Sequence, residues 1–324
     1  MVTSLDRPLT IGGVTLPNRV FLAPMSGVSD LPFRTRAAKA GAGMVVSEMV
    51  ASAELCYRHR ESLLRLSGAG LGLHVVQLAG REARWMGEAA RIAEAEGADV
   101  IDINMGCPAK KVTGGYSGSA LMRDLDHAMT LVEATVAAVK VPVTLKMRLG
   151  WDENSVNAPE LARRAEAAGV AMVTVHGRTR CQFYEGRADW DAIRAVREAV
   201  TIPLTANGDV ATRADAAEIL RRSGADAVMV GRAAYGRPWL PGEIAGKAAA
   251  PASLLDYIVA HYEDMLAHYG VVTGVRHARK HLGWYIDRHA DAAAERARIM
   301  RLSDPAAVIE ALRAIFTEPV RKVA

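Results

Sequence analysis

The 324-residue sequence predicts an α/β fold, a (β/α)₈ TIM barrel followed by a small C-terminal all-helical domain. Three observations lead to this prediction. Short apolar runs alternate with longer helical segments, eight such units follow one another, and the strand-like runs then stop near residue 248. A doubly wound sheet is the alternative, but eight strands in regular series favour a closed barrel.

Each predicted strand is a short, largely apolar run followed by a glycine, a proline or a polar turn, as is typical of fully buried parallel strands. Before the first of them, Leu9–Leu16 predicts a hairpin that turns at Gly12 and Gly13 and covers the barrel floor. The eight predicted strands are Val20–Ser26, Met44–Met49, His74–Leu78, Val100–Asn104, Val143–Arg148, Met172–His176, Leu204–Asn207 and Ala227–Val230.

The segments between these strands place apolar residues at helical spacing and end at glycines, which are natural helix stops. The clearest are Glu82–Glu96, Ala158–Ala168 and Arg213–Arg222, which are followed by Gly97, Gly169 and Gly224. After the eighth unit, Lys247–Pro251 is a predicted linker, and Ser253–Phe316 contains three or four helices by its apolar spacing. We therefore expect a barrel domain over residues 1–247 and a helical domain over residues 248–324.

The overall composition narrows the class of protein. Half of the residues are hydrophobic, which excludes wholesale disorder, and the net charge of +4 is compatible with a polyanionic partner without demonstrating one. The three cysteines form no CxxC pair, and Met1–Arg7 lacks the apolar core of a signal peptide. With no long apolar stretch in addition, we expect a cytoplasmic protein without disulfides or membrane spans.

Polar residues gather where the predicted strands end, and the carboxyl ends of the strands form the functional face of such a barrel. Lys146 would point into the barrel mouth, where a lysine must either face an anion or pair with Asp102 or Glu48. Cys107 lies in a Gly-Cys-Pro turn on the same face, so a catalytic role competes with that of a buried structural thiol.

The ends of the last two strands resemble the usual phosphate site of these barrels, because glycines let backbone N–H groups approach an anion. Gly208, Gly231 and Arg232 occupy these positions, although each glycine could also be purely structural. In the helical domain, cations interleave with aromatic residues between Arg276 and Arg288, a pattern that fits RNA. One packed helix face with solvated cations is the alternative for this segment.

These motifs together resemble the bacterial tRNA-dihydrouridine synthases, and within them the B-type branch. The resemblance extends over the whole chain, and its most specific part is the Gly-Cys-Pro run with two lysines after it. The motifs that carry it are Ala23-Pro24-Met25, Asp30-Leu31-Pro32-Phe33-Arg34, Asn104-Met105-Gly106-Cys107-Pro108, Thr144-Leu145-Lys146-Met147-Arg148, His176-Gly177-Arg178-Thr179-Arg180, Tyr184-Glu185-Gly186-Arg187-Ala188-Asp189-Trp190, Asn207-Gly208-Asp209, Gly231-Arg232 and Gly236-Arg237-Pro238-Trp239.

The resemblance implies an enzyme that reduces uridine in the tRNA D-loop, at position 17, using FMN and NADPH, with NADH left open as the electron donor. No metal is expected, and a monomer is the default expectation. Cys107 would protonate the pyrimidine. FMN would be held by Pro24, Met25, Ser26, Gln77, Lys146, His176, Asn207, Gly208, Asp209, Gly231 and Arg232, and the tRNA by Lys110, Lys111, Arg178, Arg180, Arg276, Arg279 and Lys280.

Two other functions stay open on the sequence. An FMN barrel acting on a free pyrimidine, similar to a dihydroorotate dehydrogenase, shares the cofactor site but does not explain a basic helical appendage. A non-catalytic RNA-binding regulator on a barrel scaffold is the other alternative, and the set of Cys107, Lys146 and His176 argues against it.

Overall fold

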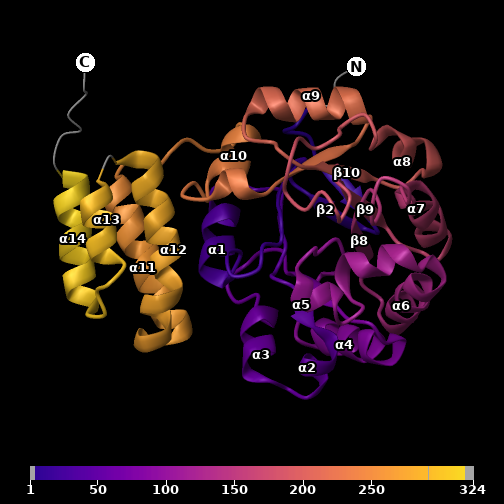
Figure 1. The fold of residues 1–324 in the computed structure, drawn as a ribbon, viewed down its shortest axis with the longest axis horizontal. Helices are drawn as coiled ribbons and strands as arrows, with labels where there is room; N and C mark the ends of the chain where they lie inside the picture. Colours follow the sequence, from indigo (N-terminus) through magenta and orange to yellow (C-terminus); the bar gives the residue numbers. More distant parts are fainter. Residues whose placement is uncertain (1–3, 291, 318–324) are drawn as a thin grey trace.

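The computed structural model describes residues 4–290 and 292–317, which form a barrel with a bundle of helices beside it (Figure 1). Expectations for residues 1–3, 291 and 318–324 of the two predicted domains lie outside the described residues. The chain begins with an antiparallel hairpin of β1 (Leu9–Ile11) and β2 (Val14–Leu16). Gly12 and Gly13 form its turn with φ of 50° and 93°, as predicted.

A parallel sheet of nine short strands curls into the barrel, which confirms the predicted fold class. The sheet order is β4-β3-β11-β10-β9-β8-β7-β6-β5, and a parallel bridge from Val46, directly after β4, to Val75 of β6 closes the ring. The strands are β3 (Val20–Leu22), β4 (Met44–Val45), β5 (Val50–Ala51), β6 (Val75–Ala79), β7 (Val100–Met105), β8 (Val143–Arg148), β9 (Met172–His176), β10 (Leu204–Asn207) and β11 (Ala227–Val230).

Nine strands replace the eight expected because the predicted second strand, Met44–Met49, was wrong as one continuous element. Residues 47–49 belong to neither β4 nor β5. The Ser47 N–H still donates to the Val75 carbonyl at 3.1 Å, but Ser47 Oγ accepts the N–H of Gln77 at 2.9 Å and the Glu48 carboxylate accepts that of Gly27. The first strand also ends earlier than predicted, at Leu22, and residues 24–26 form a loop instead.

Helices cover the outside of the barrel, and the predicted glycine stops are observed. The capping box of Thr212 and Asp215 starts α9, and Gly224 ends it with φ of 70°. The helices of the barrel domain are α1 (Leu31–Lys39), α2 (Ser52–Cys56), α3 (Arg60–Leu66), α4 (Ala83–Ala95), α5 (Lys110–Thr113), α6 (Leu125–Ala138), α7 (Ala158–Ala167), α8 (Arg194–Ala199), α9 (Arg213–Ser223) and α10 (Leu240–Ile244), with 3₁₀ helices η1 (Gly118–Arg123) and η2 (Arg232–Ala234).

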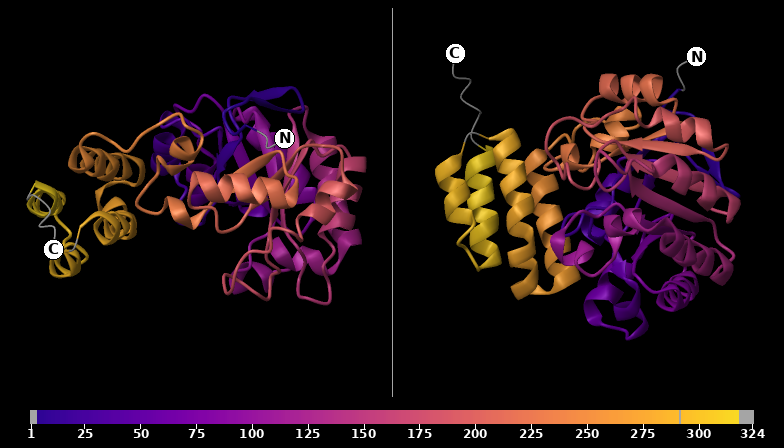
Figure 2. Two further views of the ribbon diagram at one scale, coloured as in Figure 1. Left: turned by 90° about the horizontal axis from the view of Figure 1, so that it is seen from above. Right: turned by 45° about the vertical axis from the view of Figure 1, so that its right-hand side comes forward.

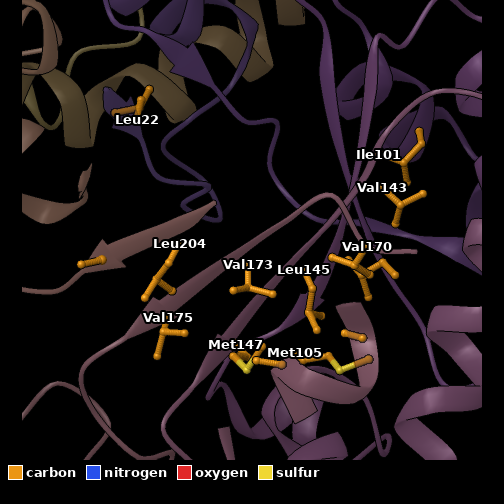
Figure 3. Packing of buried hydrophobic residues seen from close by; sticks show 14 of the residues in the cluster. Leu22, Ile101, Met105, Val143, Leu145, Met147, Val170, Val173, Val175 and Leu204 are labelled. Atoms are coloured by element: carbon orange, nitrogen blue, oxygen red, sulfur yellow. The ribbon is translucent and has the colours of Figure 1, made fainter. Parts of the chain in front are cut away.

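Two apolar clusters build the barrel. The larger packs the strands against the surrounding helices, and Figure 3 shows strand residues of this layer such as Leu145, Val173 and Leu204. The smaller fills the lower barrel interior, where Ile11 and Leu16 of the hairpin pack with inward-facing strand residues. The hairpin therefore covers the barrel floor, as predicted, and leaves the opposite end of the barrel for the site.

The helical domain is a bundle of α11 (Leu254–Tyr269), α12 (Val271–His289), α13 (Ala293–Ile299) and α14 (Pro305–Thr317), seen beside the barrel in Figure 2. It has its own apolar core, to which Trp239 from the barrel side contributes. An ion pair of 2.5 Å between Arg36 and Asp264 joins α1 to α11. No helix in the described part of the chain is both long and apolar enough to cross a membrane. The exact domain boundary stays a prediction.

Candidate active site

A cavity of about 840 Å³ opens at the carboxyl ends of the barrel strands. This volume lies within the usual range of cofactor and ligand sites. All the residues expected to bind the cofactor line it together with Cys107: Pro24, Met25, Ser26, Gln77, Lys146, His176, Asn207, Gly208, Asp209, Gly231 and Arg232.

The loop after β7 presents Cys107 to this cavity in a fixed conformation. Asn104 Oδ1 accepts the N–H groups of Gly106 and Cys107 at 3.2 and 3.0 Å, and both the N–H and Oγ of Ser119 donate to the Cys107 carbonyl. Burial raises the pKa of the Cys107 thiol, so this group is protonated at neutral pH. The thiol can therefore donate a proton to a ligand in the cavity.

Lys146 lies on β8 with its ammonium group inside the cavity and without an acidic partner. Nζ donates to Asn207 Oδ1 at 3.0 Å, and among the described residues no carboxylate lies within ion-pair distance of it. Asp102 instead accepts hydrogen bonds of 2.6 Å from both Gln77 and Thr144. Pairing of Lys146 with Asp102 or Glu48 is thus not observed, and burial lowers the pKa of Lys146 to about 8.

His176 at the end of β9 contributes a neutral imidazole to the same wall. The side chain is 8% exposed, and burial together with the nearby cations Arg148 and Lys146 holds its pKa well below the ordinary value. A neutral ring can accept one hydrogen bond and donate another. It can therefore contact a polar ligand without adding a third charge to this side of the cavity.

Sequence reasoning assigned no role to Arg148, although it lies at the end of β8. Its Nε donates to the Gly106 carbonyl at 2.8 Å, and its Nη1 donates to the carbonyls of Thr179 and Phe183, each also at 2.8 Å. Arg148 therefore ties the Cys107 loop to the loop after β9. Its place at a strand end was a usable signal, whereas nothing in the spacing of the sequence revealed Phe183 as a cavity residue.

The end of the cavity that is expected to bind phosphate lies between β10 and β11. Gly208 has φ of 123°, and a Cβ on it would lie 2.6 Å from the Cβ of Ala188, so a side chain has no room there. A Cβ on Gly231 would meet only Ala23, at 3.9 Å, which leaves its backbone accessible. Arg232 is half exposed at this end, and its guanidinium lies 3.4 Å from Asp209.

Some of the residues expected to contact RNA are exposed, and others contact other parts of the protein. Lys110 and Lys111 are exposed beside the Cys107 loop, and Arg276 is exposed on α12. Arg180 is half-buried, with its guanidinium 4.8 Å from the centre of the Trp151 ring.

Arg178, Arg279 and Lys280 make contacts within the protein, so their expected contact with RNA stays a prediction. Arg178 is 1% exposed, forms an ion pair of 2.6 Å with Asp209 and donates to two backbone carbonyls. Arg279 donates to the Leu302 carbonyl within the helical domain, and Lys280 faces the barrel next to Gly27.

Two aromatic residues of α12 are packed inside the protein, which leaves both RNA binding and the packed-face alternative open for this helix. His281 is buried, and burial lowers its pKa to about 3. Tyr285 is buried as well and bonds His261 at 2.9 Å. Within the described residues, no three His, Cys, Asp or Glu side chains gather into a group that could hold a metal ion.

Comparison with known proteins identifies the family of this chain. The family described as dihydrouridine synthase (Dus) matches residues 21–319 of the chain. The chain belongs to the dihydrouridine synthase family. A relative from Rhizobium leguminosarum bv. phaseoli, named probable tRNA-dihydrouridine synthase, is 66% identical over 90% of this chain and 93% of its own. A tRNA-dihydrouridine synthase B from Xanthomonas axonopodis pv. citri is 46% identical over 95% and 96% of the two chains.

Solved structures of other proteins resemble this dihydrouridine synthase family member in fold, and this likeness indicates no further function. Morphinone reductase superposes with a TM-score of 0.57 at 17% identity, over 78% of this chain and 92% of that one. At such low identity the likeness carries the barrel architecture alone. The family match, which also covers most of the helical domain, confirms the resemblance predicted from the motifs.

Proposed function

We propose that this chain reduces uridine in tRNA to dihydrouridine, with FMN as cofactor and NADPH as electron donor. The observation that carries the proposal is the cavity in which a protonated thiol, Cys107, and an unpaired ammonium group, Lys146, line one wall of a barrel of this family. Position 17 of the D-loop belongs to the same proposal and rests on the B-type resemblance. A monomeric state, the absence of a metal and a cytoplasmic location are proposed with it.

The cavity residues fit a flavin mononucleotide. An unpaired lysine suits the edge of a ring system that becomes negatively charged on reduction, and Lys146 would hold that edge. Gln77 would contact the same edge, because its amide keeps a free N–H and a free lone pair beyond its bonds to Asp102 and Asn104. At the other end, the backbones at Gly208 and Gly231 with the Arg232 guanidinium would hold the phosphate.

The reaction adds a hydride and a proton across the C5–C6 bond of the uracil ring. The hydride to C6 would come from reduced FMN held by the cavity residues. Cys107 supplies the proton to C5, and it suits this role because its raised pKa keeps the thiol protonated at neutral pH. Arg148 holds the loop that carries the thiol, so the proton donor keeps a fixed position relative to the cavity.

The uridine must leave the RNA stack to reach a cavity at the barrel mouth, which costs a few kcal/mol. Exposed cations around the mouth would offset part of this cost by contacting the phosphate backbone. Lys110 and Lys111 beside the thiol loop, and Arg276 on the helical domain, are placed for such contacts.

The test is reduction of an unmodified tRNA transcript by FMN-loaded protein and NADPH, with dihydrouridine measured and mapped by mass spectrometry of RNA fragments. Product at position 17 is expected. Product formed from free uridine monophosphate and not from tRNA would instead favour the free-pyrimidine alternative. Protein that binds no FMN under reconstitution would refute the cofactor assignment.

A further inference from the structure

One face of α12 contacts two separate loops of the cavity wall. Lys280, Trp284 and Arg288 follow one another at intervals of four residues, so they lie along the same side of the helix. That side faces the barrel, as the contacts below show. The helical domain therefore forms part of the support of the cavity and is not only an appendage beside it.

At one end of this face, Lys280 holds the loop that follows β3. Its Nζ lies 2.8 Å from the position that a Cβ on Gly27 would occupy, and Gly27 has φ of 71°. The Gly27 N–H donates to the Glu48 carboxylate. Burial lowers the pKa of Lys280, while the charges of Glu48 and Asp30 act in the opposite direction. An ammonium group and a carboxylate thus confine Gly27, directly after the cavity residues 24–26.

At the other end, Trp284 and Arg288 hold the loop that follows β11. Trp284 stacks on Tyr235 with ring centroids 4.1 Å apart and planes inclined by 15°. Arg288 Nε donates to the Tyr235 carbonyl at 2.9 Å. A Cβ on Gly236 would lie 2.5 Å from the Trp284 carbonyl oxygen, so helix and loop are in direct contact. Tyr235 itself lines the cavity, as do residues 231–233.

We propose that Lys280, Trp284 and Arg288 are positioning residues that fix the loops of residues 24–27 and 231–236 for flavin binding. This inference rests on the proposed function, because it takes FMN as the ligand of the cavity. It assigns Lys280 to the support of the ring-binding loop and Trp284 to that of the phosphate-binding loop. Neither side chain needs to contact the flavin, since each acts through the loop that it holds.

The experiment measures the FMN dissociation constant of flavin-free full-length variants by fluorescence quenching, with visible circular dichroism of the bound flavin as a second readout. Lys280→Met and Trp284→Leu should each raise the Kd roughly threefold to tenfold, the range expected for loss of one aromatic or charged contact. Lys280→Arg and Trp284→Phe keep the charge and the ring, so they should restore most of the affinity. Lys140→Met, an exposed lysine before β8 on the opposite side of the barrel, is the matched control.

Folded Lys280→Met and Trp284→Leu variants with the wild-type Kd and flavin dichroism would overturn the positioning role. So would a Kd that rises equally in Lys280→Arg and Trp284→Phe, because a general loss of packing would then be the cause. A fall in tRNA affinity alone would overturn it as well and return Lys280 to RNA contact. Wild-type protein that binds no FMN would refute the proposed function itself, which separates the two failures.

Discussion

Replacement of Lys146 by Met should stabilise the flavin-free protein while weakening its affinity for FMN. Burial lowers the pKa of this lysine from 10.5 to about 8, so its charge is less favourable in the folded than in the unfolded chain. A shift of this size corresponds to about 3 kcal/mol at neutral pH, at 1.36 kcal/mol per pKa unit. Loss of the hydrogen bond to Asn207 costs about 1 kcal/mol in return. The net gain in unfolding free energy is therefore about 2 kcal/mol.

The lowered pKa of Lys146 also predicts how the stability of the protein depends on pH. The folded-state pKa lies below the unfolded one, so the unfolded chain binds more protons between about pH 8 and 10.5, and stability rises with pH in that window. The stability advantage of Lys146→Met should therefore be largest at pH 7 and nearly gone at pH 10. Loss of a charge-assisted contact should meanwhile weaken FMN binding by about 1.5 to 3 kcal/mol, or roughly 10-fold to 150-fold.

Urea unfolding of the flavin-free proteins at pH 7 and 10, together with FMN titration at pH 7, measures these quantities. Lys140→Met is again the control, since it removes an exposed lysine of the same type. A flavin-free Lys146→Met variant that is less stable than the wild type at pH 7 would refute this reasoning. It would mean that a favourable partner within the protein, rather than an anionic ligand, satisfies the lysine.

Three further predictions concern other parts of the site. Cys107→Ala should slow reoxidation of the reduced flavin by tRNA about 10²-fold to 10⁴-fold in single-turnover mixing while FMN content stays normal, and Cys56→Ala should match the wild type; an unchanged rate for Cys107→Ala would make the thiol structural. Arg276→Glu should weaken tRNA binding and flatten its salt dependence without changing FMN affinity, which filter binding over a range of salt concentrations can disprove. Arg178→Leu should lower the unfolding free energy by about 1 to 3 kcal/mol, because the Glu185 and Gly186 carbonyls lose a buried donor while Asp209 keeps the Ala188 N–H and Arg232; an unchanged unfolding free energy in urea would refute this.

The thiol also predicts the pH profile of the chemical step. Because burial raises the pKa of Cys107, the thiol should stay protonated to a higher pH than an ordinary cysteine does. The rate of flavin reoxidation by tRNA should accordingly hold constant through neutral pH and fall only at alkaline pH. Stopped-flow measurement across that range checks this, and a rate that already falls between pH 6 and 7 would assign the proton to another group.

The sequence by itself determined the barrel, its floor hairpin and the residues around the cavity, because these features depend on local rules. Alternation of strands and helices is visible in the spacing of apolar residues, and the carboxyl ends of parallel strands converge in any such barrel. Cys107, Lys146 and His176 therefore come together as expected, although they lie on three different strands or strand ends.

Only the tertiary structure decided which way the long basic side chains point. Arg178, Arg279 and Lys280 look like exposed cations in the sequence, yet each faces an interior or inter-domain contact. Their direction depends on how the loop after β9 folds back and on how α12 docks against the barrel, and neither follows from local spacing. The break between β4 and β5 has a similar origin, because Ser47 and Glu48 find partners on other strands and loops. Residue type and periodicity determine which side chains lie together at the strand ends. Packing between segments distant in the sequence determines which charged side chains remain exposed and able to bind a partner.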